Sequence, residues 1–267
     1  MKKYIFLISI FLIMLNAYSQ ECGYKEYHSL VESAENDYKK KNYETAREKL
    51  ELAFTKVDFP LGKDLNLAFS VAQKCDDSEW AEHVAIQLAK GGVPIKFFLR
   101  YKKSKWFEKF KSNFQLYSDY YNENFEPEVR DRFLSMINRD KEFNKKYHQW
   151  RKKEIEISLE ELIDGATQII SDFTNLTDEF GFPTEKIMGY NYLDRKNKVG
   201  FYPTDAFIIH TYQRGVLVFK DEIGDIVCNG GLHPNSERTL KTIRGYGNGT
   251  GVRQEMEARF QKFRGGE

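Results

Sequence analysis

His210 is the histidine whose surroundings in the sequence best suit acid–base chemistry. It follows the apolar run 207–209, whereas His28, His83 and His148 lie among polar residues and are expected to be solvated. Imidazole exchanges a proton near neutral pH, so a histidine oriented by a carboxylate can act as a general base. The alternative is a core histidine whose ring nitrogens bond to the backbone, and the sequence favours this alternative.

Three carboxylates could orient His210 if the fold brought them close: Asp140, Asp172 and Asp205. The catalytic candidates are therefore His210 with Asp140 or Asp172, a set that would suit a hydrolase. Arg238 could bind an anion. His233 precedes Pro234, and we expect it to cap the helix that follows.

No metal site and no cofactor is predicted. The sequence has no Cys-x-x-Cys pair, no His-Glu-x-x-His and no Gly-x-Ser-x-Gly motif, so the common zinc and serine-hydrolase patterns are missing. The glycine-rich stretch 245–251 lacks the Gly-Lys-Ser/Thr ending of a phosphate-binding loop.

The sequence contains three cysteines, Cys22, Cys75 and Cys228, which allow one disulfide and one free thiol. Cys228 follows Ile226 and Val227, so it is expected to be a small buried hydrophobic residue. The predicted disulfide is therefore Cys22–Cys75.

Residues 1–19 have the pattern of a secretory signal peptide. Lys2 and Lys3 precede an apolar run over 5–15, and small residues precede a cleavage site after Ser19. This run of eleven residues is shorter than the roughly 20 that span a bilayer. We expect an exported protein, periplasmic or secreted, with no stable membrane insertion once the signal is removed.

Small and aromatic residues between 30 and 94 recur at helical spacing. Leu30, Ala34 and Tyr38 lie four residues apart, and Ala46 and Leu50 mark a second stripe after a polar turn. Such stripes predict antiparallel helices packed closely along their small residues. The pattern resembles a tetratricopeptide repeat, and a weaker second unit follows about 35 residues later.

Tetratricopeptide hairpins commonly bind a peptide or another protein on one face, although such hairpins can also be a plain scaffold. The candidate binding residues are Tyr38 and Tyr43 on the first hairpin, with Arg238 and Tyr246 further along the chain. The sequence favours the scaffold role for the hairpins because no basic or asparagine-rich cluster marks one of their faces.

The charge pattern argues against a nucleic-acid partner. The chain has 41 basic and 40 acidic residues, a formal charge of +1, so no overall basic field is present. Lysines between 102 and 111 alternate with aromatic residues. Such a pattern could bind single-stranded nucleic acid by charge and base stacking. We expect instead that Trp106, Phe110 and Phe114, at four-residue spacing, face inward while the lysines stay exposed.

The C-terminal half also has helical patterns. Pro127 is placed to begin one helix, Ser158 to cap another near Leu159, and Gly181 to end a short helix over 172–180. The apolar run at 216–219 could be a short strand. The sequence thus allows at most a short strand pair near 216–228.

Short motifs in this half resemble a bacterial helical domain of unknown function. The matching elements are Met136 to Asp140, Gly181-Phe182-Pro183, Gly189, His210 and Tyr246-Gly247. Lys141 and Ile209 stand where that family has glutamine, and Asn248-Gly249 interrupts its terminal Tyr-Gly-Thr. The resemblance implies a compact helical domain, often exported and attached to repeat-like helices, and implies no activity.

The sequence therefore predicts a mainly α protein. The expected parts are a signal peptide (1–19), tetratricopeptide-like hairpins (20–96), connecting helices (97–128) and a C-terminal helical domain (129–267). The expected role is a non-catalytic scaffold of the cell envelope that binds a protein or peptide. The alternative is a hydrolase that uses His210 with an aspartate.

Overall fold

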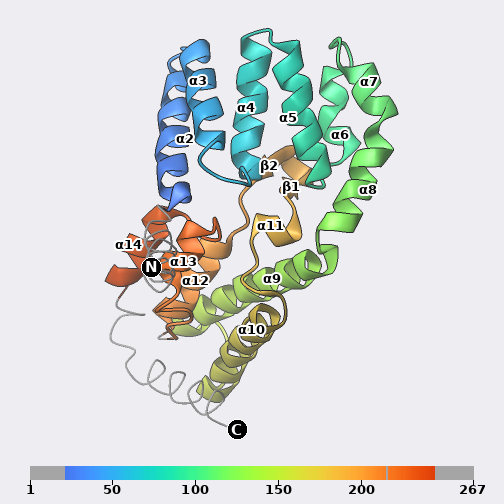
Figure 1. Cartoon of the computed structure of the whole chain (residues 1–267). Coiled ribbons are helices and arrows are strands. Elements are labelled where there is room, and N and C mark those ends of the chain that lie inside the picture. Colours follow the sequence, from blue (N-terminus) through green and yellow to red (C-terminus); the bar gives the residue numbers. More distant parts are fainter. Residues whose placement is uncertain (1–21, 215, 244–267) are drawn as a thin grey trace, which may run out of the picture.

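The computed structural model describes residues 22–214 and 216–243. Helices make up most of these residues, and one small antiparallel sheet is present, so the predicted mainly α class is confirmed. Figure 1 shows upright helices at one end of the molecule and a second group of helices below them. The predicted signal peptide (1–19) and Tyr246 lie outside the described residues.

Two antiparallel hairpins form the first half of the chain. Their helices are α2 (Gly23–Lys39), α3 (Tyr43–Phe54), α4 (Gly62–Lys74) and α5 (Ser78–Lys90). Helices α2 and α3 pack on each other, as do α4 and α5. Alanines fill these contacts, and Ala34, Ala46 and Ala81 are completely buried. The predicted hairpin packing is therefore confirmed.

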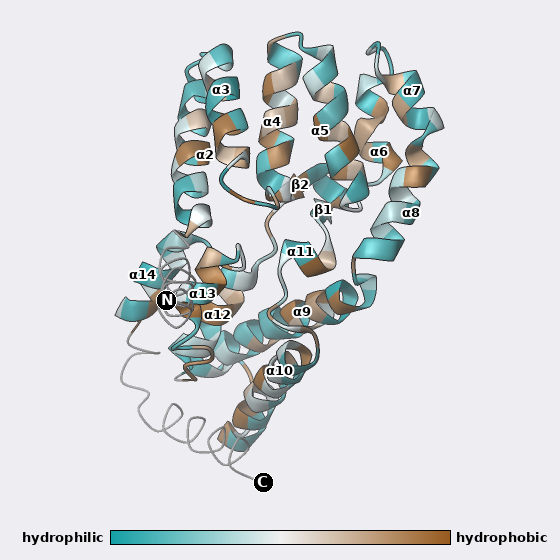
Figure 2. Ribbon diagram, in the orientation of Figure 1, coloured by the Kyte–Doolittle hydropathy of each residue, from teal (hydrophilic) through white to brown (hydrophobic). Residues whose placement is uncertain are grey.

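Shorter helices follow the hairpins along the edge of the molecule. They are α6 (Ile95–Phe98), the 3₁₀ turn η1 (Leu99–Tyr101), α7 (Phe107–Ser112) and α8 (Phe114–Asn124). Trp106 and Phe110 are buried, which confirms the expectation that the aromatic residues of this basic stretch face inward. Figure 2 shows hydrophobic and hydrophilic residues interspersed along the helices, as expected where one face is buried.

Two long helices, α9 (Pro127–Arg151) and α10 (Leu159–Phe180), pack together in the second half. Pro127 begins α9, the Ser158 hydroxyl accepts a hydrogen bond from the Glu161 N–H, and Gly181 ends α10 with φ +80°. These three predicted helix ends are confirmed. The separate helix predicted at 172–180 is wrong, because α10 runs through this segment without a break.

Four shorter helices complete this half: α11 (Glu185–Met188), α12 (Thr204–Gln213), α13 (Ile223–Cys228) and α14 (Pro234–Thr242). His233 caps α14, since its Nδ1 accepts a hydrogen bond from the Asn235 N–H. His233 was predicted in this role.

The only sheet of the described residues pairs β1 (Asn191–Leu193) with β2 (Lys198–Gly200). Tyr192 lies opposite Val199, and the turn η2 (Asp194–Lys196) joins the strands. The sequence allowed at most a short strand pair and placed it near 216–228; the one pair of the described residues lies at 191–200 instead, and residues 223–228 form α13. Val216 and Val218 are buried in the C-terminal core but form no strand. A short apolar run indicates burial and does not by itself distinguish a strand from another buried segment.

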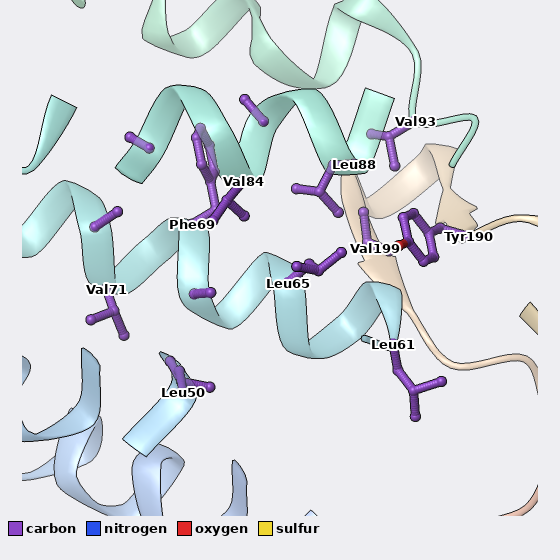
Figure 3. Packing of buried hydrophobic residues seen from close by; sticks show 14 of the residues in the cluster. Leu50, Leu61, Leu65, Phe69, Val71, Val84, Leu88, Val93, Tyr190 and Val199 are labelled. Atoms are coloured by element: carbon purple, nitrogen blue, oxygen red, sulfur yellow. The ribbon is translucent and has the colours of Figure 1, made fainter. Parts of the chain in front are cut away.

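The described residues form two hydrophobic cores, one among the hairpins and one around α9, α10 and α12. The boundary between them does not follow the order of the chain, because Tyr190 and Val199 belong to the core of the hairpins. Figure 3 shows both side chains next to Leu88 of α5. The strand hairpin of the second half therefore completes the core of the first half.

The structure corrects two further predictions. Cys22 forms a disulfide with Cys228, whose Cα lies 4.8 Å away, and Cys75 is a free thiol. The predicted Cys22–Cys75 pair is wrong because α2 begins beside the end of α13, a contact 206 residues apart in sequence. His28 is not solvated but buried, 8% exposed, because its ring packs against His233.

Candidate functional site

Helices α9 and α12 bring His210 and Asp140 together. His210 Nδ1 lies 2.6 Å from Asp140 Oδ2, although the residues are 70 positions apart. Of the three carboxylates predicted as partners of His210, Asp140 is the one that reaches it. A carboxylate within hydrogen-bond distance is the first geometric condition for acid–base catalysis by histidine.

A second polar residue follows each of these two by four positions. After His210 it is Arg214, the residue that ends α12, whose Nη2 donates to Asp140 Oδ1 at 2.6 Å. On α9 it is Asn144, whose amide oxygen accepts from the same Arg214 nitrogen at 2.8 Å. Residues four apart lie on one face of a helix, so these two faces meet in a four-residue polar cluster. We call Asp140, Asn144, His210 and Arg214 the Asp–His cluster.

The Asp–His cluster is buried on one side and open to solvent at His210. The side chains of Asp140 and Arg214 are 3% and 1% exposed, whereas that of His210 is 30% exposed. The Arg214 guanidinium also lies over the Phe143 ring, 4.4 Å from its centre, a favourable cation–π arrangement. The ionic groups are thus shielded from water while the imidazole can reach it.

Two groups compete for Nδ1 of His210. The Asp140 carboxylate, 2.6 Å away, can only accept a hydrogen bond, whereas the Asn144 amide nitrogen, 2.8 Å away, can only donate one. A proton on Nδ1 satisfies the carboxylate, and the Asn144 nitrogen then donates to Asp140 Oδ2 at 3.3 Å. In this tautomer Nε2 keeps a lone pair and could take a proton from water or a substrate.

The other predicted carboxylates lie elsewhere. Asp172 pairs with Arg139 at 2.6 Å on the α9–α10 surface, and Asp205 accepts a hydrogen bond from the His233 N–H at 3.1 Å. Arg238 is exposed on α14. The candidate catalytic set is therefore His210 with Asp140, and Asp172 does not belong to it.

The predicted binding tyrosines lie together at the end of the first hairpin. The rings of Tyr38 and Tyr43 are 5.6 Å apart, and both residues are half-buried. Among the described residues, no contact joins Arg238 to Tyr38 or Tyr43. Tyr246 is outside the described part of the chain.

Sequence reasoning missed Arg214 and Asn144. The available signal was their spacing, because each follows a candidate residue by four positions and so shares its helix face. Among the described residues, no group of three or more histidine, cysteine or acidic side chains could hold a metal ion.

Comparison with protein-family models, curated proteins and solved structures found no match to this chain. The likenesses to tetratricopeptide repeats and to a bacterial helical domain thus have no family match behind them, and antiparallel hairpin packing is what the structure supports. Within residues 22–214 and 216–243, no helix is both long and apolar enough to cross a membrane.

Proposed function

We propose that the Asp–His cluster is an acid–base site and that the chain is a hydrolase. The single observation that carries this proposal is the 2.6 Å contact between His210 Nδ1 and Asp140 Oδ2. It orients the imidazole and leaves Nε2 as a base, as in other sites where a carboxylate positions a catalytic histidine. The sequence favoured a core histidine bonded to backbone groups, but the partners of His210 are side chains.

The proposed step is general-base hydrolysis. Nε2 of His210 takes a proton from a water molecule as its oxygen attacks the substrate, and the Asp140 carboxylate stabilises the resulting imidazolium. The imidazolium then returns the proton to the leaving group, so the enzyme ends the cycle unchanged. Arg214 is a positioning residue, because it holds Asp140 rather than contacting the reacting atoms.

The competing explanation is that these hydrogen bonds only fasten α9 to α12. Hydrolysis of chromogenic carboxylic esters, phosphate esters and glycosides by the purified chain distinguishes the two explanations. We expect turnover of one of these substrate classes and a 10²–10⁴-fold loss in His210→Ala. The matched control His83→Ala, at an exposed position of α5, should keep wild-type turnover. Equal turnover in both variants, with circular dichroism showing that both are folded, would contradict the proposal.

A second proposal concerns binding and keeps the role expected from the sequence. The tetratricopeptide-like hairpins would bind a protein or peptide, with no nucleic acid as partner. What supports it is the contact of two half-buried tyrosine rings, Tyr38 and Tyr43, at the turn of the first hairpin, since tyrosine is enriched in binding surfaces. Capture from an envelope extract should fall in Tyr38→Ser/Tyr43→Ser and persist in His210→Ala; equal capture by both would contradict this proposal.

We also propose export to the periplasm or the medium. The signal-like sequence at 1–19 supports it, and so does the Cys22–Cys228 disulfide, because disulfides persist in oxidising compartments. Intact-mass analysis of the natural protein tests this proposal. A chain that begins at Gln20 and carries one disulfide is expected, whereas a chain that retains residues 1–19 would contradict it.

A further inference from the structure

A small cavity lies where the first hairpin meets the C-terminal helices, away from the Asp–His cluster. Its volume is about 40 Å³, which exceeds the roughly 10–15 Å³ that one water molecule needs. His28 of α2, Glu185 of α11 and Tyr202, which follows β2, contribute to its lining, with Asp205 and His233. We call it the Glu185 cavity.

Three residues of the lining each have a buried polar atom without a hydrogen-bond partner: His28 Nε2, Glu185 Oε1 and the Tyr202 hydroxyl. All three residues are at least nine-tenths buried. A buried polar atom left without a partner costs about 1–3 kcal/mol, so it is uncommon for three such residues to line one cavity. They come from three separate segments, which the fold brings to one place.

Charges of both signs lie near the cavity: Glu185, Asp64 and Asp205 are acidic. The Lys63 ammonium acts on His28 and lies 4.8 Å from the ring centre of Phe201, a lining residue. The other oxygen of Glu185, Oε2, accepts a hydrogen bond from the Gly62 N–H at 2.7 Å, and Asp64 on α4 adds a negative charge nearby. Burial and this charge raise the pKa of Glu185 to about 8. Burial and the neighbouring His233 lower the pKa of His28 to about 3, so its imidazole is neutral at physiological pH.

We propose that the Glu185 cavity binds the ammonium group of a small primary amine, with Glu185 as its counter-ion. An ammonium group has three N–H donors and no acceptor, and three lining residues each carry an unpartnered atom that can accept. An anion would be repelled by the carboxylates of Glu185 and Asp205, which both line the cavity. A metal ion is disfavoured because no group of three or more metal-binding side chains is gathered among the described residues.

Binding of the ammonium group must change the protonation of Glu185. The empty cavity holds Glu185 mainly as the neutral acid below pH 8, and the bound cation stabilises the carboxylate. The carboxyl proton therefore leaves to solvent as the ammonium ion enters. The exchange conserves charge inside the protein.

Isothermal titration of the full chain with methylammonium at pH 7, in two buffers of different ionisation enthalpy, tests the proposal. We expect saturable binding with close to one proton released per ammonium ion. Methanol, a neutral probe of similar size, should give no saturable heat. No binding of methylammonium, equal binding of methanol, or binding without proton release would each overturn the proposal and leave a cavity filled by water.

Variants locate the binding in the cavity. Glu185→Gln, which keeps the side-chain shape, should weaken methylammonium binding at least tenfold, and Glu123→Gln, at an exposed glutamate of α8, should leave it unchanged. Tyr202→Phe removes only one hydroxyl and should weaken binding several-fold even if Glu185→Gln does not fold. Wild-type affinity in Tyr202→Phe or in folded Glu185→Gln would overturn the assignment.

Discussion

At the scale of single residues, the most unusual feature is an ion pair in the interior between Asp140 and Arg214. Two charges are costly to bury, and their attraction compensates only when geometry and further hydrogen bonds are good. Here Asn144 and His210 supply those bonds. Nε and Nη1 of Arg214 nevertheless have no hydrogen-bond partner. The net contribution of this ion pair to stability is therefore smaller than its close contacts suggest.

The ion pair predicts strong coupling between its two members. Asp140→Asn leaves Arg214 buried without a counter-charge, and Arg214→Met does the converse, so each should lower the free energy of unfolding by about 3–5 kcal/mol. The double variant should lose much less than the sum, because neither charge is then left alone. Urea denaturation of all four proteins measures this coupling; additive losses would contradict it.

His28 predicts a loss of stability in mild acid. Its pKa is about 3 in the folded chain against an ordinary 6.5, so the unfolded chain takes up the proton first as pH falls. The contribution of neutral His28 to the free energy of unfolding is complete above pH 6.5 and declines as the pH falls toward 3. Between pH 7 and pH 5 the free energy of unfolding should fall by about 2 kcal/mol. Urea denaturation of wild type and His28→Gln at both pH values should reveal this difference.

Glu185 should change the stability with pH in the opposite direction from His28. Its pKa is raised to about 8 from 4.5, so its contribution to the free energy of unfolding is complete below pH 4.5 and is lost as the pH rises toward 8. The stability of Glu185→Gln relative to wild type should therefore increase with pH over this range. The same pH trend in the Glu185 and His28 variants would show that neither residue carries the assigned effect.

At the scale of elements, helix ends and helix faces were predictable and distant pairing was not. Pro127, Ser158 and Gly181 act through neighbours within a few positions, so their patterns specify local structure. The strands could not be located, because Tyr192 and Val199 pair across a turn that has no strong hairpin signal. The Asp–His cluster was half predictable: Asp140 was among three possible partners, and only tertiary packing selects it.

The Tyr190 ring packs the strand hairpin against the core of the first half of the chain. Substitutions beside this ring should therefore destabilise the fold. A Cβ added at Gly91 would lie 2.1 Å from the Tyr190 ring, and one at Gly62 would lie 2.6 Å from it. Gly91→Ala should therefore displace the ring and destabilise the fold by about 2–3 kcal/mol. Thermal unfolding measures the effect.

Gly224 provides the matched control for this substitution. A Cβ at Gly224 in α13 would meet nothing within 4 Å, and alanine is the better helix former. Gly224→Ala should therefore be neutral or stabilise the fold slightly. Similar melting temperatures for the two variants would mean that Tyr190 does not fill the space beside Gly91.

At the scale of the whole molecule, the two halves are joined by contacts distant in sequence. Tyr190 and Val199 complete the core of the hairpins, Glu185 accepts from Gly62, and Lys186 pairs with Asp58. Among these residues Glu185 lines the Glu185 cavity, and Lys186 follows it on α11. The cavity lining also includes His28 of the first half and Asp205 of the second. A ligand in the cavity would therefore contact both halves and would stabilise their association.

The Cys22–Cys228 disulfide cross-links the two halves and supports the last prediction. It closes a loop of 206 residues, and cross-linking a long loop restricts the unfolded chain most. Cys22→Ser/Cys228→Ser should lower the free energy of unfolding by about 3–5 kcal/mol, and reduction of the wild type should have the same effect. Cys75→Ser, which removes the free thiol, should leave the response to reductant intact. Urea titrations with and without dithiothreitol compare the variants; a wild type insensitive to reductant, or a Cys75 variant that loses the response, would refute the pairing.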